Sequence, residues 1–137
     1  MRTIAILLFA VALMLSGCHA PYGAYQDRME IAEYWAAAAP FAIMNFTYSG
    51  TTLRLEMKNS DMDELTITDI SLNGSSVYST ETLFKSDETR NITITLDKPC
   101  GASSDLYYLG DVVITYNKGS ITGLREVGTR PLARWCE

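Results

Sequence analysis

The sequence has very little of the chemistry that most enzymes use. Its 137 residues include a single histidine, His19, which stands in a short tether and not in a rigid element that could hold a general base. The chain also lacks a Cys-x-x-Cys pair, a glycine-rich phosphate loop and a Gly-x-Ser-x-Gly turn. We therefore expect a protein without catalytic residues or a cofactor.

Positive charge is also scarce. The chain carries 11 Lys and Arg against 16 Asp and Glu, a formal net charge of −5. Contacts to phosphate need a basic footprint, so nucleic acid is excluded as a partner. No polybasic patch is present to hold anionic lipid. Any attachment to a membrane must therefore come from the N-terminus.

The N-terminus reads as a secretory leader. Arg2 precedes an apolar run over 4–15, and about twelve residues are too few to span a bilayer. The following 15–18, Leu-Ser-Gly-Cys, resembles the lipobox of prokaryotic lipoprotein precursors. This resemblance implies a signal peptide over 1–17, removed before Cys18, and a lipid on Cys18. We expect an extracytoplasmic, membrane-anchored protein at the cell surface.

Two further cysteines remain once Cys18 carries the lipid. Cys100 and Cys136 would form a disulfide in an exported domain, the alternative being two free buried thiols. The bond would close a loop of about 36 residues, worth roughly 4 kcal/mol, and would hold the C-terminus.

A tether with a short helix is predicted over 18–40. Its helical part, 24–39, is rich in alanine and free of glycine and proline, and Pro40 ends it. At helical spacing, one apolar stripe gathers Tyr25, Met29, Ala32 and Ala36, with Ile31, Tyr34 and Trp35 alongside. Two roles stay open for this helix: a spacer that packs on its own domain, or a surface for a membrane or a partner.

From residue 41 the period changes to that of β-structure. Residues 51–58 alternate cleanly, whereas 65–72 changes phase, which predicts a bulge near Thr68 and Asp69. Asn73-Gly74 predicts a hairpin turn, and 107–116 is predicted as one strand. About seven short strands with regular turns predict one antiparallel β-sandwich domain over 41–137.

Several short segments over 34–137 resemble the ectodomain of archaeal type IV pilin-like proteins. They are Tyr34-Trp35, Pro40–Ile43, Leu65–Ile70 leading to Asn73-Gly74, Glu88-Thr89 before Ile92–Thr95, Cys100 after a proline, and Pro131-Leu132 before the last cysteine. The resemblance implies an immunoglobulin-like sandwich displayed outside the cell. It leaves three roles open: a lipid-anchored binding or structural protein, a filament subunit that keeps its apolar helix, and an accessory domain of a surface complex.

Three Asn-x-Ser/Thr sequons suit an exported β-protein. They begin at Asn45, Asn73 and Asn91, and each is a candidate for N-glycosylation. Asn73 is the best placed of the three, because it occupies the predicted turn, and Asn91 points to the solvent-facing side of its strand.

Two weaker candidates complete the set. Asp61 and Asp63 alternate as calcium ligands do, but the glycine and the bidentate acid of an EF-hand are missing, so a solvated acidic turn is the alternative.

Exposed aromatic side chains could bind a surface protein or a glycan, although packing in the sandwich explains them more simply. The aromatic set is Trp35, Tyr107, Tyr108, Tyr116 and Trp135.

Overall fold

The structure, a computed structural model, describes residues 28–137. The chain divides into two units, Met1–Glu30 and Ile31–Glu137, and the second is the β-domain. The signal peptide predicted over 1–17 and the lipidation predicted at Cys18 lie outside the described residues. No helix within 28–137 is long and apolar enough to cross a bilayer.

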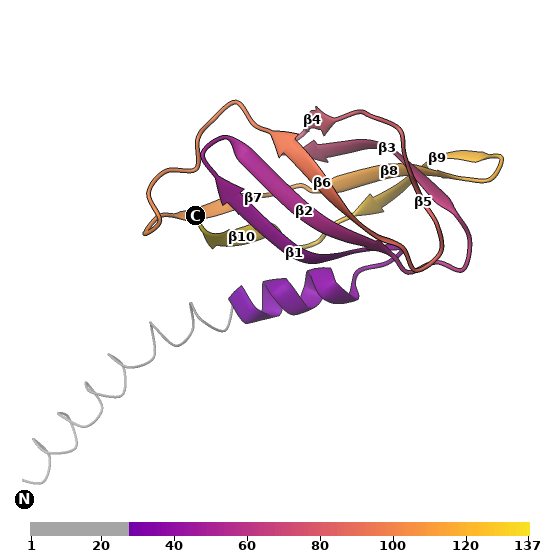
Figure 1. Cartoon of the computed structure of the whole chain (residues 1–137), viewed down its shortest axis with the longest axis horizontal. Coiled ribbons are helices and arrows are strands. Elements are labelled where there is room, and N and C mark those ends of the chain that lie inside the picture. The colour runs from indigo at the N-terminus through magenta and orange to yellow at the C-terminus, as the bar shows by residue number, and fades with distance from the viewer. Residues whose placement is uncertain (1–27) are drawn as a thin grey trace, which may run out of the picture. The chain divides into compact units, whose positions relative to one another are not determined.

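The β-domain is built from antiparallel strands in sandwich-like layers. Its strands are β1 (Phe41–Ser49), β2 (Thr52–Asn59), β3 (Leu65–Leu72), β4 (Ser75–Tyr78), β5 (Thr82–Phe84), β6 (Thr89–Thr95), β7 (Leu106–Leu109), β8 (Val113–Lys118), β9 (Ile121–Val127) and β10 (Leu132–Trp135). One sheet has the order β1-β2-β6, a second has the order β4-β3-β8-β9 with β5 also paired to β3, and β10 pairs with β7. In Figure 1 β1, β2 and β6 lie in front of β3, β8 and β9.

The core lies between these layers and takes side chains from both. The largest fully buried side chains are Trp35, Phe41, Ile43, Phe46, Leu53, Leu55, Met57, Leu65, Ile67, Ile70, Phe84 and Ile94. The predicted alternation of β2 is confirmed, because Leu53, Leu55 and Met57 are buried and the residues between them are not. The all-β prediction is therefore confirmed at the level of a sandwich.

Two bulges keep the apolar side chains of long strands directed inward. In β3 the pairing register with β8 shifts between Ile67 and Asp69, which confirms the predicted bulge. In β1 the register shifts between Ile43 and Asn45, so that Phe46 is buried as well as Ile43. One extra residue reverses which side chains of a strand face inward. In both strands the bulge therefore directs apolar side chains on either side of it into the same core.

One predicted turn is confirmed, and one predicted strand is interrupted by a turn that was not predicted. Asn73 and Gly74 have φ values of 52° and 81° and form the predicted two-residue turn between β3 and β4. The single strand predicted over 107–116 is wrong, because it is divided into β7 and β8. Gly110 and Asp111 interrupt it, and Asp111 has a φ of 47°, which no strand residue adopts.

A helix over residues 28–37 precedes the sheets. Ile31 and Trp35, one turn apart, are buried. The indole Nε1 of Trp35 donates to the carbonyl oxygen of Pro131 at 2.9 Å. Of the described members of the predicted stripe, Met29 and Ala36 are exposed and Ala32 is half-buried. The residues beside that stripe make the core contact instead, so the second half of this helix is part of the domain.

Asn59 joins two loops at the end of the domain where β2 finishes. Its side chain is fully buried, and its Nδ2 donates to the carbonyl oxygens of Asp63 at 2.9 Å, Lys85 at 3.2 Å and Phe84 at 3.3 Å. Its Oδ1 accepts from the backbone N–H of Asp61 at 2.9 Å. One amide therefore satisfies backbone groups from both the β2–β3 and the β5–β6 connections.

We expect Asn59→Asp to lower the free energy of unfolding by about 3 kcal/mol, because a carboxylate cannot donate to carbonyl oxygens and would be buried with its charge. Urea unfolding at pH 7 measures the change. Asn117→Asp is the matched control: the Oδ1 of Asn117 accepts from the backbone N–H of Gly123 at 3.1 Å, a bond that a carboxylate keeps. Equal losses in the two variants would contradict the role given to the Asn59 amide.

Candidate functional site

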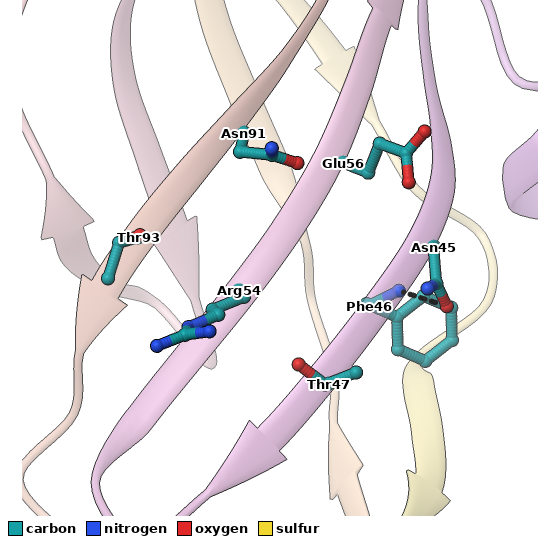
Figure 2. A pocket seen from close by; sticks show the side chains of 7 residues that line it. All are labelled: Asn45, Phe46, Thr47, Arg54, Glu56, Asn91 and Thr93. Atoms are coloured by element: carbon teal, nitrogen blue, oxygen red, sulfur yellow. Dashed lines mark hydrogen bonds between the residues drawn. The ribbon is translucent and has the colours of Figure 1, made fainter.

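The outward surface of the β1-β2-β6 sheet carries two rows of polar side chains. Strand pairing places Glu56 of β2 opposite Asn45 of β1 and Asn91 of β6. The next outward residue of β2, Arg54, is opposite Thr47 and Thr93 in the same way. We call these six residues the polar face; Figure 2 shows them together with Phe46.

The polar face is hollowed at two places that share Arg54 and Thr47. One hollow of about 320 Å³ lies over the two rows. The other, of about 300 Å³, continues toward the chain end; its lining is Thr47, Ser49, Thr52, Arg54 and Glu137. The six residues of the polar face offer amides, hydroxyls, one carboxylate and one guanidinium, which are hydrogen-bonding groups of almost no net charge; Glu137 adds a carboxylate to the second hollow.

Asn45 is held in a fixed orientation. Its Oδ1 accepts from the backbone N–H of Phe46 at 3.0 Å and from Nη1 of Arg134 at 2.7 Å. The guanidinium of Arg134 in turn lies over the Phe46 ring, 4.4 Å from its centroid. The amide therefore has both its oxygen and its plane constrained by neighbours from β1 and β10.

The two charged residues of the polar face have no ionic partner within the part of the chain that the structure describes. Neither Arg54 nor Glu56 forms an ion pair there, although they stand two residues apart on one strand. Both groups are thus available to a ligand or to a covalently attached group on this surface.

Asp61 and Asp63, the calcium candidates, lie beside a cation that the protein itself supplies. Nζ of Lys118 is 3.1 Å from Oδ2 of Asp61 and 3.5 Å from Oδ2 of Asp63. The hydrogen bond from Lys118 lowers the pKa of Asp61, and the same contact raises the pKa of Lys118. A calcium ion between these carboxylates would have to displace the ammonium group. No group of three or more His, Cys, Asp or Glu within 28–137 is arranged to hold a metal.

Asn73, the asparagine of the remaining sequon, is hydrogen-bonded to the loop after β7. Its Oδ1 accepts from the backbone N–H of Gly110 at 3.2 Å, and its own N–H donates to the Gly110 carbonyl at 2.9 Å. Its sequon is folded around the turn formed with Gly74. Asn73 therefore has a structural role of its own.

The aromatic residues proposed as a platform do not share one surface. Trp35 and Tyr107 are buried, and burial raises the pKa of Tyr107. Tyr116 is half-buried and its ring packs edge-on against Phe41 with centroids 5.5 Å apart. Only Tyr108 and Trp135 expose large areas. Packing accounts for most of this set.

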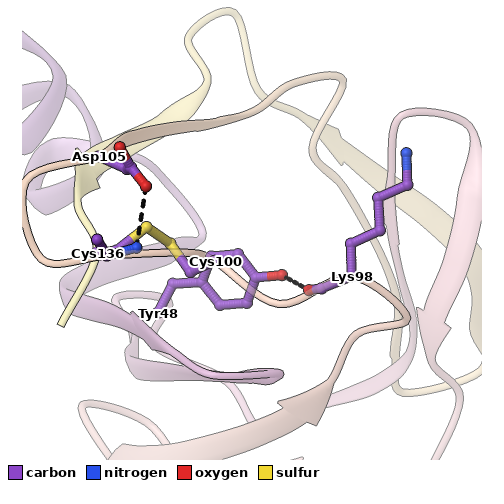
Figure 3. Close-up of a disulfide and its surroundings, with 6 residues drawn as sticks. Tyr48, Lys98, Cys100, Asp105 and Cys136 are labelled. Carbon is purple, nitrogen blue, oxygen red and sulfur yellow. Dashed lines mark hydrogen bonds between the residues drawn. A yellow bond between two sulfur atoms is a disulfide. The ribbon is translucent and has the colours of Figure 1, made fainter.

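Cys100 and Cys136 form the predicted disulfide, with their Cα atoms 5.7 Å apart. Figure 3 shows the bond beside Tyr48, whose hydroxyl donates to the carbonyl oxygen of Lys98. Next to it the backbone N–H of Cys136 donates to the Asp105 carbonyl at 2.8 Å. The last residue, Glu137, donates its N–H to the Tyr48 carbonyl at 3.0 Å. The C-terminus is thus closed onto the loop that follows β6.

Glu126 of β9 carries a partly buried carboxyl group that lies beside the first residue of β1. Its Oε1 accepts from the backbone N–H of Phe41 at 2.7 Å, and its buried Oε2 has no hydrogen-bond partner among the described residues. Burial raises the pKa of Glu126 from its ordinary value of 4.5 to about 7, against the opposing effect of the Phe41 N–H. Between pH 4.5 and 7 the folded protein therefore holds a proton at Glu126 that the unfolded chain releases.

This difference gives stability a pH dependence of known sign. Between pH 4.5 and 7 the folded state binds more protons at Glu126, so the free energy of unfolding should fall as pH rises, by about 2 kcal/mol. Glu126→Gln should remove that slope and should be more stable than the natural protein at pH 8. Urea unfolding at pH 4.5 and pH 8 tests this, with Glu56→Gln on the exposed polar face as the control. An unchanged slope in Glu126→Gln would contradict the assignment.

Sequence analysis predicted the outward orientation of some residues of the polar face but not which residues lie side by side. Alternation along β2 put Arg54 and Glu56 on the wet face, but only strand register shows that Asn45 and Asn91 flank Glu56. Arg134 carried no sequence signal, since it reaches Asn45 from a strand 89 residues later. Comparisons with protein-family models, with curated proteins and with solved structures found no match.

Proposed function

We propose that this protein is a non-catalytic, membrane-anchored surface protein on the extracytoplasmic side, with a binding or structural role. The observation that carries the proposal is the Cys100–Cys136 disulfide. Such a bond persists in an oxidising compartment and is rare in a reducing one. It agrees with the secretory leader predicted over 1–17 and with the cysteine at position 18, which lie ahead of the domain in the sequence.

We further propose that the sandwich is immunoglobulin-like. The sheet orders support this, because β1-β2-β6 corresponds to strands A, B and E of that fold and β3-β8-β9 corresponds to C, F and G. In this arrangement β4 takes the place of an additional strand beside C. Domains of this architecture present the outer surfaces of their sheets to solvent, and the polar face is such a surface.

Mass spectrometry of the mature protein, isolated from the membranes of its own cells, tests the anchor. We expect a chain that begins at Cys18 and carries a diacylglyceryl group, and we expect Cys18→Ala to abolish the modification and release the protein from membranes. A full-length chain found in the cytosol with reduced thiols would contradict the proposal. A polymer that retains residues 4–15 would instead support a filament subunit.

A further inference from the structure

We propose that Asn45 and Asn91 both carry N-linked glycans, which cover the polar face of the β1-β2-β6 sheet. This inference rests on the proposed function, because the transfer of such glycans requires an exported chain. It goes beyond the presence of sequons, since the structure distinguishes these two sites from the third.

The two sequons are built into their strands in the same way. In each, the middle residue belongs to the core: Phe46 is 1% exposed and Ile92 is 3% exposed. Side chains alternate along a strand, so burying the middle residue turns the asparagine and the threonine on either side of it outward together. Asn45 and Asn91 are both exposed.

Strand register brings the two sites side by side. Asn45 and Asn91 flank Glu56 in one row, and neighbouring strands are about 4.8 Å apart, so the two residues are about 10 Å apart across β2. Two glycans would therefore rise from one small area and shield the sheet between them.

The Asn45 amide is oriented for modification. Its oxygen is held by Arg134 and by the Phe46 N–H, whereas its Nδ2 makes no hydrogen bond within the described residues. Nδ2 is the atom that forms the new bond. In the transfer it bonds to the anomeric carbon of a sugar carried on a lipid phosphate, the bond between that carbon and the phosphate oxygen breaks, and the proton that Nδ2 loses passes to the released lipid phosphate.

The unpaired charges of the polar face fit this arrangement. Glu56 lies between the two asparagines, and Arg54 lies one row along between the two threonines. A carboxylate and a guanidinium without ionic partners can accept from and donate to sugar hydroxyl groups. A protein interface would instead need an apolar or aromatic centre, which the polar face does not provide. A protein partner would then have to approach from another side of the domain.

Asn73 is different. Its amide oxygen accepts from the Gly110 N–H, as the Asn45 oxygen accepts from its neighbours, but its sequon is bent around a turn in which both Asn73 and Gly74 have positive φ. The asparagine and the hydroxyl residue of this sequon do not share a strand face as they do in β1 and β6. We therefore expect Asn73 to remain unmodified.

The test is mass spectrometry of the intact protein and its peptides, with the protein purified from its own cells. Thr47→Val and Thr93→Val each destroy one sequon without changing the asparagine, and valine preserves the shape and the strand preference of threonine. We expect each variant to lose the mass of one glycan and the double variant to lose two. Thr47→Ser, which keeps the sequon, should keep the glycan, and Ser75→Ala, which destroys the sequon of Asn73, should leave the mass of attached sugar unchanged.

The outcomes separate this inference from the proposed function. A chain that carries lipid on Cys18 but no sugar on Asn45 or on Asn91 would overturn the inference and leave the proposed function standing. Sugar found on Asn73 alone would overturn it as well. A chain without lipid, held in the cytosol, would refute the proposed function itself.

Discussion

Replacing Trp35 by alanine should lower the free energy of unfolding by about 4 kcal/mol, a loss typical of a large aromatic side chain removed from a core. The Trp35 side chain is 0% exposed, and its indole N–H donates to Pro131 at 2.9 Å. The substitution would remove the buried ring and would also leave the carbonyl oxygen of Pro131 without its hydrogen-bond donor. Urea unfolding of the full mature chain, followed by circular dichroism, measures the change.

The chain offers a matched control, because its second tryptophan, Trp135, is 46% exposed. Trp135→Ala should cost less than half as much as Trp35→Ala. Gly128→Ala probes the same contact from the other side, since a Cβ at Gly128 would lie 2.4 Å from Cη2 of Trp35. We expect this variant to be destabilised too, because neither the buried indole nor the backbone beside it can move freely. Equal losses at Trp35 and Trp135 would refute a core role for the helix.

The burial of Trp35 also shows what the sequence could not reveal about the fold. Helical spacing predicted that this segment is a helix, but which face is buried depends on the loop that brings Pro131 and Gly128 to it. That contact joins residues 96 apart in the chain. The β3 bulge was predictable for the opposite reason, because the phase change between Ile67 and Ile70 lies within a single short segment of the sequence.

The same distinction applies to the candidate site. Each sequon is local and was found at once, and the alternation of β2 placed Arg54 and Glu56 outward. The convergence of Asn45 and Asn91 on Glu56 needs the register of three strands, which pattern alone does not fix. Sequence-based reasoning also favoured Asn73 for its turn, whereas the structure shows that the positive φ values of Asn73 and Gly74 bend this sequon out of the extended form that the other two have.

Reducing the Cys100–Cys136 disulfide should lower the free energy of unfolding by about 4 kcal/mol, because the bond closes a loop with a sequence separation of 36 and restricts the unfolded chain. The unfolding temperature should fall by roughly 15 °C for a domain of this size. The double variant Cys100→Ala/Cys136→Ala should match the reduced natural protein. Cys18→Ala, compared in detergent, should unfold as the natural protein does, and dithiothreitol should leave the double variant unchanged.

The loss should also have a local component, which hydrogen exchange can separate from the global one. Without the disulfide β10 is held by its pairing with β7 and by the contacts of Arg134 with Asn45 and Phe46. The residues after β10 are held by two backbone bonds, from Cys136 to Asp105 and from Glu137 to Tyr48. A short two-stranded ribbon is marginally stable by itself, so amides of β10 should exchange faster than those of β2 after reduction. If reduction changed neither the unfolding temperature nor the protection of β10, the disulfide would not be what closes this end of the domain.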